Sequence, residues 1–423
     1  MSTPASALQV SFTAATLTGN HGAEAMLLAA MGRLRDRFPN ATFNVFSYYP
    51  RADREAVSGA SVRVFSLTPL ALVLRLVPLA ALLALLRRVG LGGLLRLFPA
   101  DVRALARSRV QVDLAGVSFV AGRGRFLPYN TLTLLPAFLL GVPVVKGAQA
   151  MGPFTTPLNR RLARAFLARC DAVFARGERS LSFVRELLGA PPGVRRADDL
   201  AFLLEPRDGL ARREAPGLEH LLETVESRRG GARSVVGLCP SSLLAARDPK
   251  GYVGLMAALA AELVGGGDLV VLFPNATRGR FDAGPRNNDL HTISQVLDAV
   301  HADVRAGVVS VEEDVHAVDI LRVLQTVDLA VVSRFHAMVG ALSLGKPAVV
   351  VGWSHKYLEV MEEFGLGEYV LDARETALPS VMASVDALRA DLTGCRAHIA
   401  ARLEGVRRSA VGQIDYIASK MRA

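Results

Sequence analysis

Three basic side chains, Arg334, His336 and Lys356, follow two successive apolar strands predicted at 328–333 and 348–352. Ligands of an open parallel sheet bind beyond the carboxyl ends of its strands, and the N–H groups at a helix start favour an anion there. Arginine offers a planar fork, lysine a point charge and histidine a proton near neutral pH. The spacing predicts an anion site with an acid–base group. The alternative is an Arg334 that pairs structurally and a packed His336.

Hydroxyl and amide side chains follow other predicted strand ends in the same half of the chain. Ser333 closes the strand before Arg334, and Pro240-Ser241-Ser242 follows the first strand of this half, where backbone and hydroxyls suit a phosphate. Asn275 follows the next strand. Asn288 or Asp289 either caps a helix or contacts a ligand.

The first half contributes a loop and an arginine. Asn20 and Gly22 suit a tight turn after the first strand, and Glu24 is the first acid of the helix that follows. The loop either faces the cleft and contacts a substrate, or it is an ordinary strand-to-helix turn. Arg176 ends a strand and either binds an anionic group or pairs with Glu178 or Asp199.

Strand-like and helix-like segments alternate through both halves, which indicates βαβ units and mostly parallel sheets. We predict an α/β protein with two Rossmann-like domains facing a central cleft, similar to glycosyltransferase-B enzymes. The first, acceptor-side domain covers 1–206, and a linker rich in Arg, Glu and Gly covers 207–232. The second, donor-side domain covers 233–375, and helices complete the chain over 376–423.

Residues 67–98 form a very apolar insertion in the first domain. Its longest uncharged run, 76–86, is too short for a bilayer span of about 20 residues. Arg75, Arg87 and Arg96 interrupt the leucines, which suits a helix lying on an anionic membrane. A helical hairpin packed on the first domain is the alternative.

Composition excludes several classes of protein. Hydrophobic residues make up 51% of the 423, which supports large cores, and three separated cysteines predict no disulfide framework. The formal charge of +10 comes from scattered arginines, so we predict no nucleic-acid partner. Without a metal-spaced Cys/His cluster, a GxGxxG opening a helix or a GxxxxGK[ST], we predict no metal and no cofactor. The N-terminus lacks the pattern of a secretory signal, so we expect a cytoplasmic protein.

The segment SRFHAMVGALSLGKPAVVVGWSHKY, 333–357, resembles the C-terminal motif of the polysaccharide pyruvyl transferase family. Four earlier segments resemble the same family in the same order: GNHGAEAM, KGAQAMGPF, FARGERS and ADDLAFLL. The first loop departs from the family pattern, because its acid, Glu24, comes one place later than usual.

The resemblance implies transfer of a pyruvyl group from phosphoenolpyruvate to sugar hydroxyls of a cell-surface or exopolysaccharide precursor, forming a ketal. It implies that His336 and Arg176 are catalytic and that Lys356 is functional. Phosphoenolpyruvate carries a phosphate and a carboxylate, so it needs at least two cationic partners. We therefore place Arg334, Lys356, Ser333 and Ser241 on the donor.

On the acceptor we place Asn20, Gly22 and Glu24. The acceptor is a sugar or a lipid-linked oligosaccharide, and a lipid-linked one would make peripheral contact at the inner face of the membrane useful. The alternatives are a glycosyltransferase that uses a nucleotide sugar and a non-catalytic factor in glycan assembly.

Overall fold

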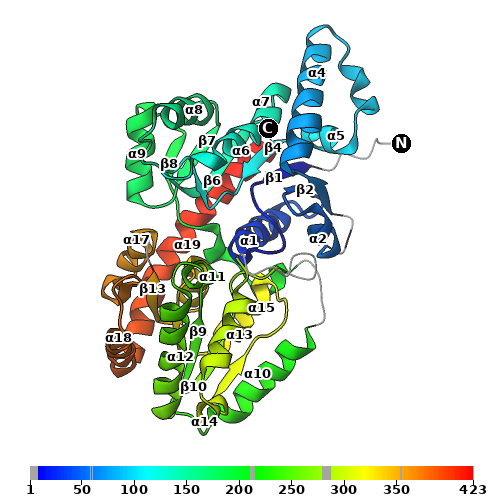
Figure 1. The fold of residues 1–423 in the computed structure, drawn as a ribbon. Coiled ribbons are helices and arrows are strands. Elements are labelled where there is room, and N and C mark those ends of the chain that lie inside the picture. The colour runs from blue at the N-terminus through cyan, green and yellow to red at the C-terminus, as the bar shows by residue number, and fades with distance from the viewer. Residues whose placement is uncertain are drawn as a thin grey trace. The chain divides into compact units, whose positions relative to one another are not determined.

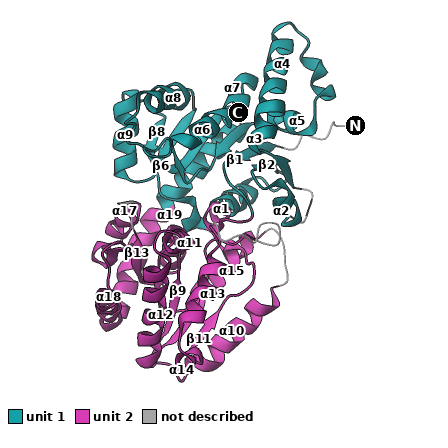
Figure 2. Cartoon of the chain, in the orientation of Figure 1, with its two compact units in different colours: residues 1–17, 26–203, 408–423 teal, residues 18–25, 204–407 magenta. Residues whose placement is uncertain are grey.

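The computed structural model describes residues 8–422 except 58, 60, 210–214, 279–286 and 353–354. Trp353 and Ser354 of the C-terminal motif therefore lie outside the described residues, as does Arg286. The chain forms two compact units, coloured separately in Figure 2. Unit 1 comprises 1–17, 26–203 and 408–423, and unit 2 comprises 18–25 and 204–407.

Each unit is built on a parallel sheet, and the strands are labelled in Figure 1. The sheet of unit 1 has the order β3-β2-β1-β4-β6-β7-β8, with β5 paired to β6. Its strands are β1 Gln9–Thr13, β2 Thr42–Ser47, β3 Val62–Ser66, β4 Val110–Asp113, β5 Val117–Ser118, β6 Val144–Met151, β7 Ala172–Ala175 and β8 Val194–Arg196.

The sheet of unit 2 has the order β11-β10-β9-β12-β13-β14. Its strands are β9 Val235–Cys239, β10 Leu269–Leu272, β11 Val308–Ser310, β12 Leu329–Val332, β13 Ala348–Gly352 and β14 Val370–Asp372. The central strands are buried on both faces and are continuous apolar runs, as strands covered by helices require. The order reverses between β9 and β12, so the topological switch point of a doubly wound sheet lies there.

Helices follow most strands. Those that lie wholly in unit 1 are α2 Pro50–Glu55, α3 Pro69–Ala71, α4 Val77–Arg88, α5 Ala100–Arg107, α6 Leu127–Leu132, α7 Leu135–Leu140, α8 Pro157–Leu167 and α9 Glu178–Leu188. Those of unit 2 are α10 Pro216–Arg229, α11 Ser242–Ala245, α12 Pro249–Gly265, α13 Asp289–Ala299, α14 Ala302–Arg305, α15 Ala317–Thr326, α16 Phe335–Ser343, α17 His355–Glu363 and α18 Leu378–Ala390.

Two helices contribute to both units. Helix α1, His21–Arg37, begins in unit 2 and continues in unit 1, and α19, Leu392–Arg422, runs from unit 2 into unit 1. In unit 1, Gln413 of α19 accepts a hydrogen bond from the Ala148 amide at 2.7 Å and donates one to the Asp198 carbonyl at 2.7 Å. The C-terminal turns of the chain are therefore an integral part of the first unit.

The division differs from the predicted domains in three places. Residues 18–25 belong to unit 2, although the sequence places them in the first domain. The predicted linker 207–232 contains α10, which buries Leu218, Leu221 and Val225 in unit 2. Residues 408–423, which the sequence places in C-terminal helices after the second domain, belong to unit 1.

Within the apolar insertion, residues 69–88 form one helical stretch, with a π-helical turn, Leu72–Leu76, between α3 and α4. A short 3₁₀ helix, Gly92–Leu97, follows after a turn. One side of the 69–88 stretch packs in a core cluster of unit 1 with Leu134, Ala137 and Leu140. Among the described residues, this stretch, Pro69–Arg88, is long and apolar enough to cross a membrane by length and composition.

Candidate active site

Eight of the nine predicted site residues lie in unit 2, and Arg176 lies in unit 1. Ser241 follows β9 and Ser333 follows β12, so both flank the switch point of the sheet. The buried hydroxyl of Tyr252, on α12, links them, because it accepts a hydrogen bond from the Ser241 amide at 2.9 Å and bonds the Ser333 side chain. No sequence motif marks Tyr252 as a functional residue; the sequence shows only a tyrosine near the start of a helix.

His336 and Lys356 contact the same aromatic ring. The ring centroid of Phe335 lies 5.1 Å from that of His336, edge to face, and 4.9 Å from the Lys356 ammonium nitrogen. The same ammonium lies 5.3 Å from the ring centroid of Tyr357, whose hydroxyl donates to the Ser333 carbonyl at 3.2 Å. The structure thus gathers His336, Lys356 and Ser333 around one pair of rings at the carboxyl edge of the sheet.

Arg334 is neutralised by a buried acid. Its guanidinium donates to both carboxylate oxygens of Asp289, which is fully buried, and also to Asn287 and Ser242 at 3.0 and 2.9 Å. Burial opposes a charged Arg334, but Asp289 outweighs it and raises the pKa of the guanidinium. Of the two interpretations open for Arg334, the structure shows the structural pairing, with Asp289 as the partner. The placement of Arg334 on the donor stays a prediction.

Asp289 also organises the loops around it. Its carboxylate accepts backbone hydrogen bonds from Ser242, Asn275 and Ala276 at 2.9 to 3.1 Å. The helix cap at Asn288 has no side-chain hydrogen bond. Asn288 occupies the helix cap position, and Asp289 is a buried anchor for the loops after β9 and β10, while its contact with a ligand stays a prediction.

The loop 18–25 packs against this cluster within unit 2. A Cβ atom on Gly22 would lie 1.9 Å from Nδ1 of His336, so only a glycine leaves the imidazole where it is. Asn20 caps α1, because its side-chain oxygen accepts from the Gly22 amide at 3.2 Å. The structure therefore brings Gly22, predicted on the acceptor side, against His336, predicted to be catalytic.

Glu24 is buried between two histidines that the sequence analysis missed. Its carboxylate bonds Nδ1 of His316 at 2.7 Å and Nδ1 of His21 at 3.0 Å, and it accepts from the Ala317 amide at 3.0 Å. Burial would raise the pKa of Glu24, but the charge of His316 and the two histidine hydrogen bonds lower it to about 2. This arrangement favours a positioning role for Glu24.

The two histidines extend this network to other elements of unit 2. Glu24 raises the pKa of His316 to about 9 against the effect of burial, with smaller contributions from Asp319 and Asp314. Nε2 of His21 lies 3.1 Å from the Thr277 hydroxyl, which in turn bonds Asp314. The network ties the start of α1 to the start of α15 and to the loop after β10.

Arg176 lies at the carboxyl end of β7 in unit 1. Its guanidinium pairs with the buried Asp199, and it donates to the Gly116 carbonyl at 2.9 Å. Of the two structural partners considered from sequence, the structure shows the bond to Asp199. Nearby in the same sheet, buried Lys146 donates to Asp113 at 2.9 Å.

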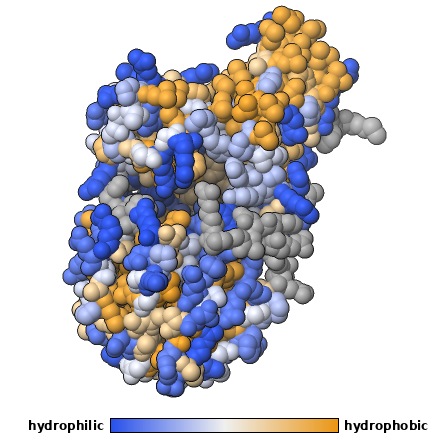
Figure 3. Space-filling model, viewed as in Figure 1, coloured by the Kyte–Doolittle hydropathy of each residue, from blue (hydrophilic) through white to orange (hydrophobic). Residues whose placement is uncertain are grey.

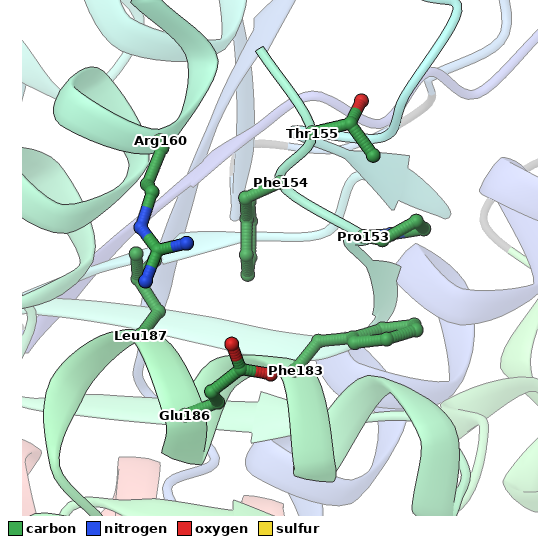
Figure 4. Close-up of a pocket in the computed structure, with 7 residues that line it drawn as sticks. All are labelled: Pro153, Phe154, Thr155, Arg160, Phe183, Glu186 and Leu187. Carbon is green, nitrogen blue, oxygen red and sulfur yellow. The ribbon is translucent and has the colours of Figure 1, made fainter. Parts of the chain in front are cut away.

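A pocket of about 270 Å³ opens beyond the carboxyl end of β6 in unit 1. Figure 4 shows the rings of Phe154 and Phe183 facing it, with the charged ends of Arg160 and Glu186 at its edge. Aromatic faces beside charged hydrogen-bonding groups suit a pyranose ring, which has apolar C–H faces and a polar rim. Within the described residues, no group of three or more His, Cys, Asp or Glu side chains is placed to hold a metal ion.

Solved structures of low sequence identity share this architecture. The trehalose-6-phosphate synthase OtsA matches with a TM-score of 0.58 at 11% identity, over 98% of this chain and 99% of that one. UGT71G1 of Medicago truncatula, solved with UDP-glucose, also gives 0.58 at 10% identity, over 99% of both chains. A Neisseria meningitidis UDP-GlcNAc 2-epimerase gives 0.56 at 12% identity, over 98% and 99%. The fold is the glycosyltransferase-B-like class of two Rossmann-like domains, which confirms the prediction.

The family model for polysaccharide pyruvyl transferase matches residues 20–355, so the chain belongs to that family and is a transferase. Among curated proteins, the amylovoran biosynthesis protein AmsJ of Erwinia amylovora is 25% identical over 254 residues. That alignment covers 60% of this chain and 59% of the relative, which is less than two thirds of its length. The resemblance predicted from the five motifs is thus confirmed.

Proposed function

We propose that the chain transfers the pyruvyl group of phosphoenolpyruvate to two hydroxyls of a sugar in a cell-surface or exopolysaccharide precursor, forming a pyruvate ketal. The observation that carries this proposal is the shared contact of His336 and Lys356 with Phe335 at the carboxyl edge of unit 2. A cation and an acid–base group lie there beside Ser333, and Tyr252 links Ser333 to Ser241, which suits a small donor that carries a phosphate and a carboxylate. Membership of the family supports the reaction type.

The chemistry assigns a role to each group. Protonation of the donor at C3 makes C2 electrophilic, and one sugar hydroxyl adds to C2. The second hydroxyl then displaces phosphate from C2 and closes the ketal. One hydroxyl proton in effect ends on C3 and the other on the departing phosphate. We assign the proton transfer to His336 and the binding of the donor's negative charge to Lys356, and we keep Arg176 as a second catalytic candidate because the family resemblance implies it.

Calorimetric titration of phosphoenolpyruvate into the wild type and into His336→Ala, Lys356→Ala and Arg176→Ala tests the donor. We expect at least tenfold weaker binding in Lys356→Ala, because a desolvated ion pair with the donor is lost. Lys250→Ala is the matched control, since Lys250 is an exposed lysine of the same unit on α12. Unchanged affinity in Lys356→Ala, or heat from a nucleotide sugar and none from phosphoenolpyruvate, overturns the proposal.

Turnover separates binding from chemistry. Phosphate release in the presence of acceptor glycans is expected to fall in His336→Gln more than donor affinity does, because a proton-transfer group contributes about 10²–10⁴-fold to rate. The pH–rate profile of the wild type should show a histidine limb that His336→Gln removes. A limb that persists in the variant assigns the proton transfer to another group.

A further inference from the structure

The helical insertion of unit 1, residues 69–97, is here called the arm, and it is apolar on two opposite sides. Its inner side, Leu72, Leu76, Ala80 and Leu83, is almost fully buried in the core of unit 1. Arg87 fixes the far end by donating to the Leu140 carbonyl at 2.9 Å. The arm is therefore a docked part of the fold.

The opposite side of the arm, here called its outer face, presents large apolar side chains to solvent. Its residues, all between 47% and 73% exposed, are Leu70, Val73, Leu74, Leu82, Leu85, Val89, Leu91 and Leu97. Figure 3 shows a hydrophobic, orange surface over the part labelled α4 in Figure 1. A surface helix of a soluble domain normally carries polar residues on this side. An apolar patch of this kind marks an interaction surface.

A basic pocket lies at the base of the arm. It measures about 340 Å³ and is lined by Arg63, Arg103 and Arg107 together with Gln9, Phe65, Ala100 and Ala104, none of which is acidic. Arg103 connects the pocket to the arm, because its guanidinium donates to the Phe98 carbonyl at 2.9 Å and the Arg96 carbonyl at 3.2 Å. Three guanidiniums without a carboxylate suit a phosphate group.

The charge around the arm has one sign. Between positions 56 and 112 the sequence holds eight arginines and a single acid, Asp101. Asp101 is 3% exposed and bonds Arg75 at 2.6 Å, so it presents no negative charge to solvent. An exposed apolar strip flanked by arginines is the composition that binds anionic lipid surfaces.

We propose that the outer face of the arm lies on an anionic phospholipid bilayer, with the Arg63–Arg103–Arg107 pocket holding a lipid phosphate. The arm lies in the interface and does not span the bilayer, because a crossing would pull Leu72, Leu76, Ala80 and Leu83 out of the unit 1 core. A second copy of this chain fits the outer face less well, since a two-fold contact would bring the two arginine sets together. The inference concerns location and is independent of the proposed reaction.

Vesicle flotation of the full-length protein tests it, with phosphatidylcholine alone and with phosphatidylcholine mixed with phosphatidylglycerol. The arm variant is Leu74→Glu with Leu85→Glu, and the pocket variant is Arg63→Gln with Arg107→Gln. The matched control is Leu158→Glu with Arg161→Gln on α8, where Leu158 is 63% exposed. Circular dichroism and the urea-unfolding transition of unit 1 show that each variant is folded.

We expect binding to the mixed vesicles, at least tenfold weaker for the arm variant and weakened by salt, with the control unchanged. The pocket variant should bind mixed vesicles more weakly than the wild type. No flotation with the mixed vesicles, or equal flotation by the arm variant, overturns the proposal. So does a wild-type dimer that the arm variant converts to a monomer, because a second copy then covers the outer face. If inorganic phosphate alone releases the protein from the vesicles completely, the pocket binds a soluble anion, and the assignment of a lipid phosphate to it is overturned.

Discussion

Gly22 lies directly against the imidazole of His336, where a Cβ atom would stand 1.9 Å from Nδ1 and 2.3 Å from Cγ. Both residues belong to unit 2, although their positions in the chain differ by more than three hundred residues. The close approach makes the position of the proposed proton-transfer group depend on a loop that follows the first strand of the chain.

Gly22→Ala is therefore expected to displace His336. We predict a fall in kcat of at least tenfold and a loss of about 1–3 kcal/mol in the free energy of unfolding, the usual cost of overpacking. Steady-state kinetics and urea unfolding measure the two effects. Gly254→Ala is the control, because a Cβ on Gly254, in a helix of the same unit, meets nothing within 4 Å. Wild-type kcat in Gly22→Ala would show that the loop moves away without cost.

The Glu24–His316 pair fixes that loop, and removing either partner leaves the other buried without its main contact. We predict that Glu24→Gln and His316→Gln each lower the free energy of unfolding by about 3–5 kcal/mol, as for other broken buried pairs. The comparison is Glu219→Gln, which breaks the exposed pair with Arg322 and should cost no more than about 1 kcal/mol. Equal losses in the buried and exposed variants would contradict this role.

The same pair predicts a stability maximum in mildly acidic solution. The pKa of Glu24 falls from 4.5 to about 2, so its contribution is present above pH 4.5 and is lost as the pH falls through 2. The pKa of His316 rises from 6.5 to about 9, so its contribution is present below pH 6.5 and is lost as the pH rises through 9. His21, Asp314 and Asp319 are the other titratable groups of this network.

Unfolding free energies measured between pH 6 and 10 test the alkaline side. We expect the wild type to lose more stability than His316→Gln over this range, because only the wild type has the His316 proton, stabilised by the Glu24 carboxylate, to release. Parallel curves for the two proteins would assign the decline to other groups.

The sequence predicted the fold and the strand ends that carry the proposed donor residues, because both depend on local pattern. Apolar runs such as 329–332, followed by a helix, determine a buried parallel strand and place Ser333 and His336 at its carboxyl end. Five motifs in order then indicated the family.

The rest depends on contacts between distant residues. His316 and Glu24 are 292 positions apart, and a lone histidine before a helix carries no signal for an ion pair. Asp289 has the pattern of a helix start, and nothing nearby in the sequence indicates that it neutralises Arg334. The sequence likewise does not predict that residues 18–25 pack in unit 2, because a strand-to-helix loop has the same sequence pattern whichever core it packs on.

The Arg334–Asp289 pair supports loops that hold predicted donor residues, so its loss should affect both stability and binding. Arg334→Lys keeps the charge but loses the fork that reaches Asp289, Asn287 and Ser242 at once. We predict weaker phosphoenolpyruvate binding and a lower unfolding free energy, measured by calorimetry and urea titration. Arg322→Lys, at an exposed pair of the same unit, is the control. Wild-type behaviour of Arg334→Lys would show that a point charge suffices for Asp289.

Unit 1 holds a comparable buried pair, Lys146 in the first half of β6 with Asp113 at the carboxyl end of β4. The two side chains are 1% and 2% exposed, and Gln149 also donates to the Asp113 carboxylate at 2.7 Å. Lys146→Met keeps the volume but leaves Asp113 a buried charge without its cation, so we predict a loss of about 3–5 kcal/mol. Adding Asp113→Asn should recover part of that loss, because the neutral amide removes the uncompensated charge.

Lys420→Met on the partly exposed Lys420–Asp171 pair is the control, with an expected cost of about 1 kcal/mol or less. Because the chain folds as two units, urea unfolding should be followed with probes in each, and the change is expected in the transition of unit 1. No recovery in the Lys146→Met/Asp113→Asn double variant would mean that Lys146 stabilises the unit through packing on Phe119, whose ring centroid lies 5.6 Å from the ammonium, and not through its charge.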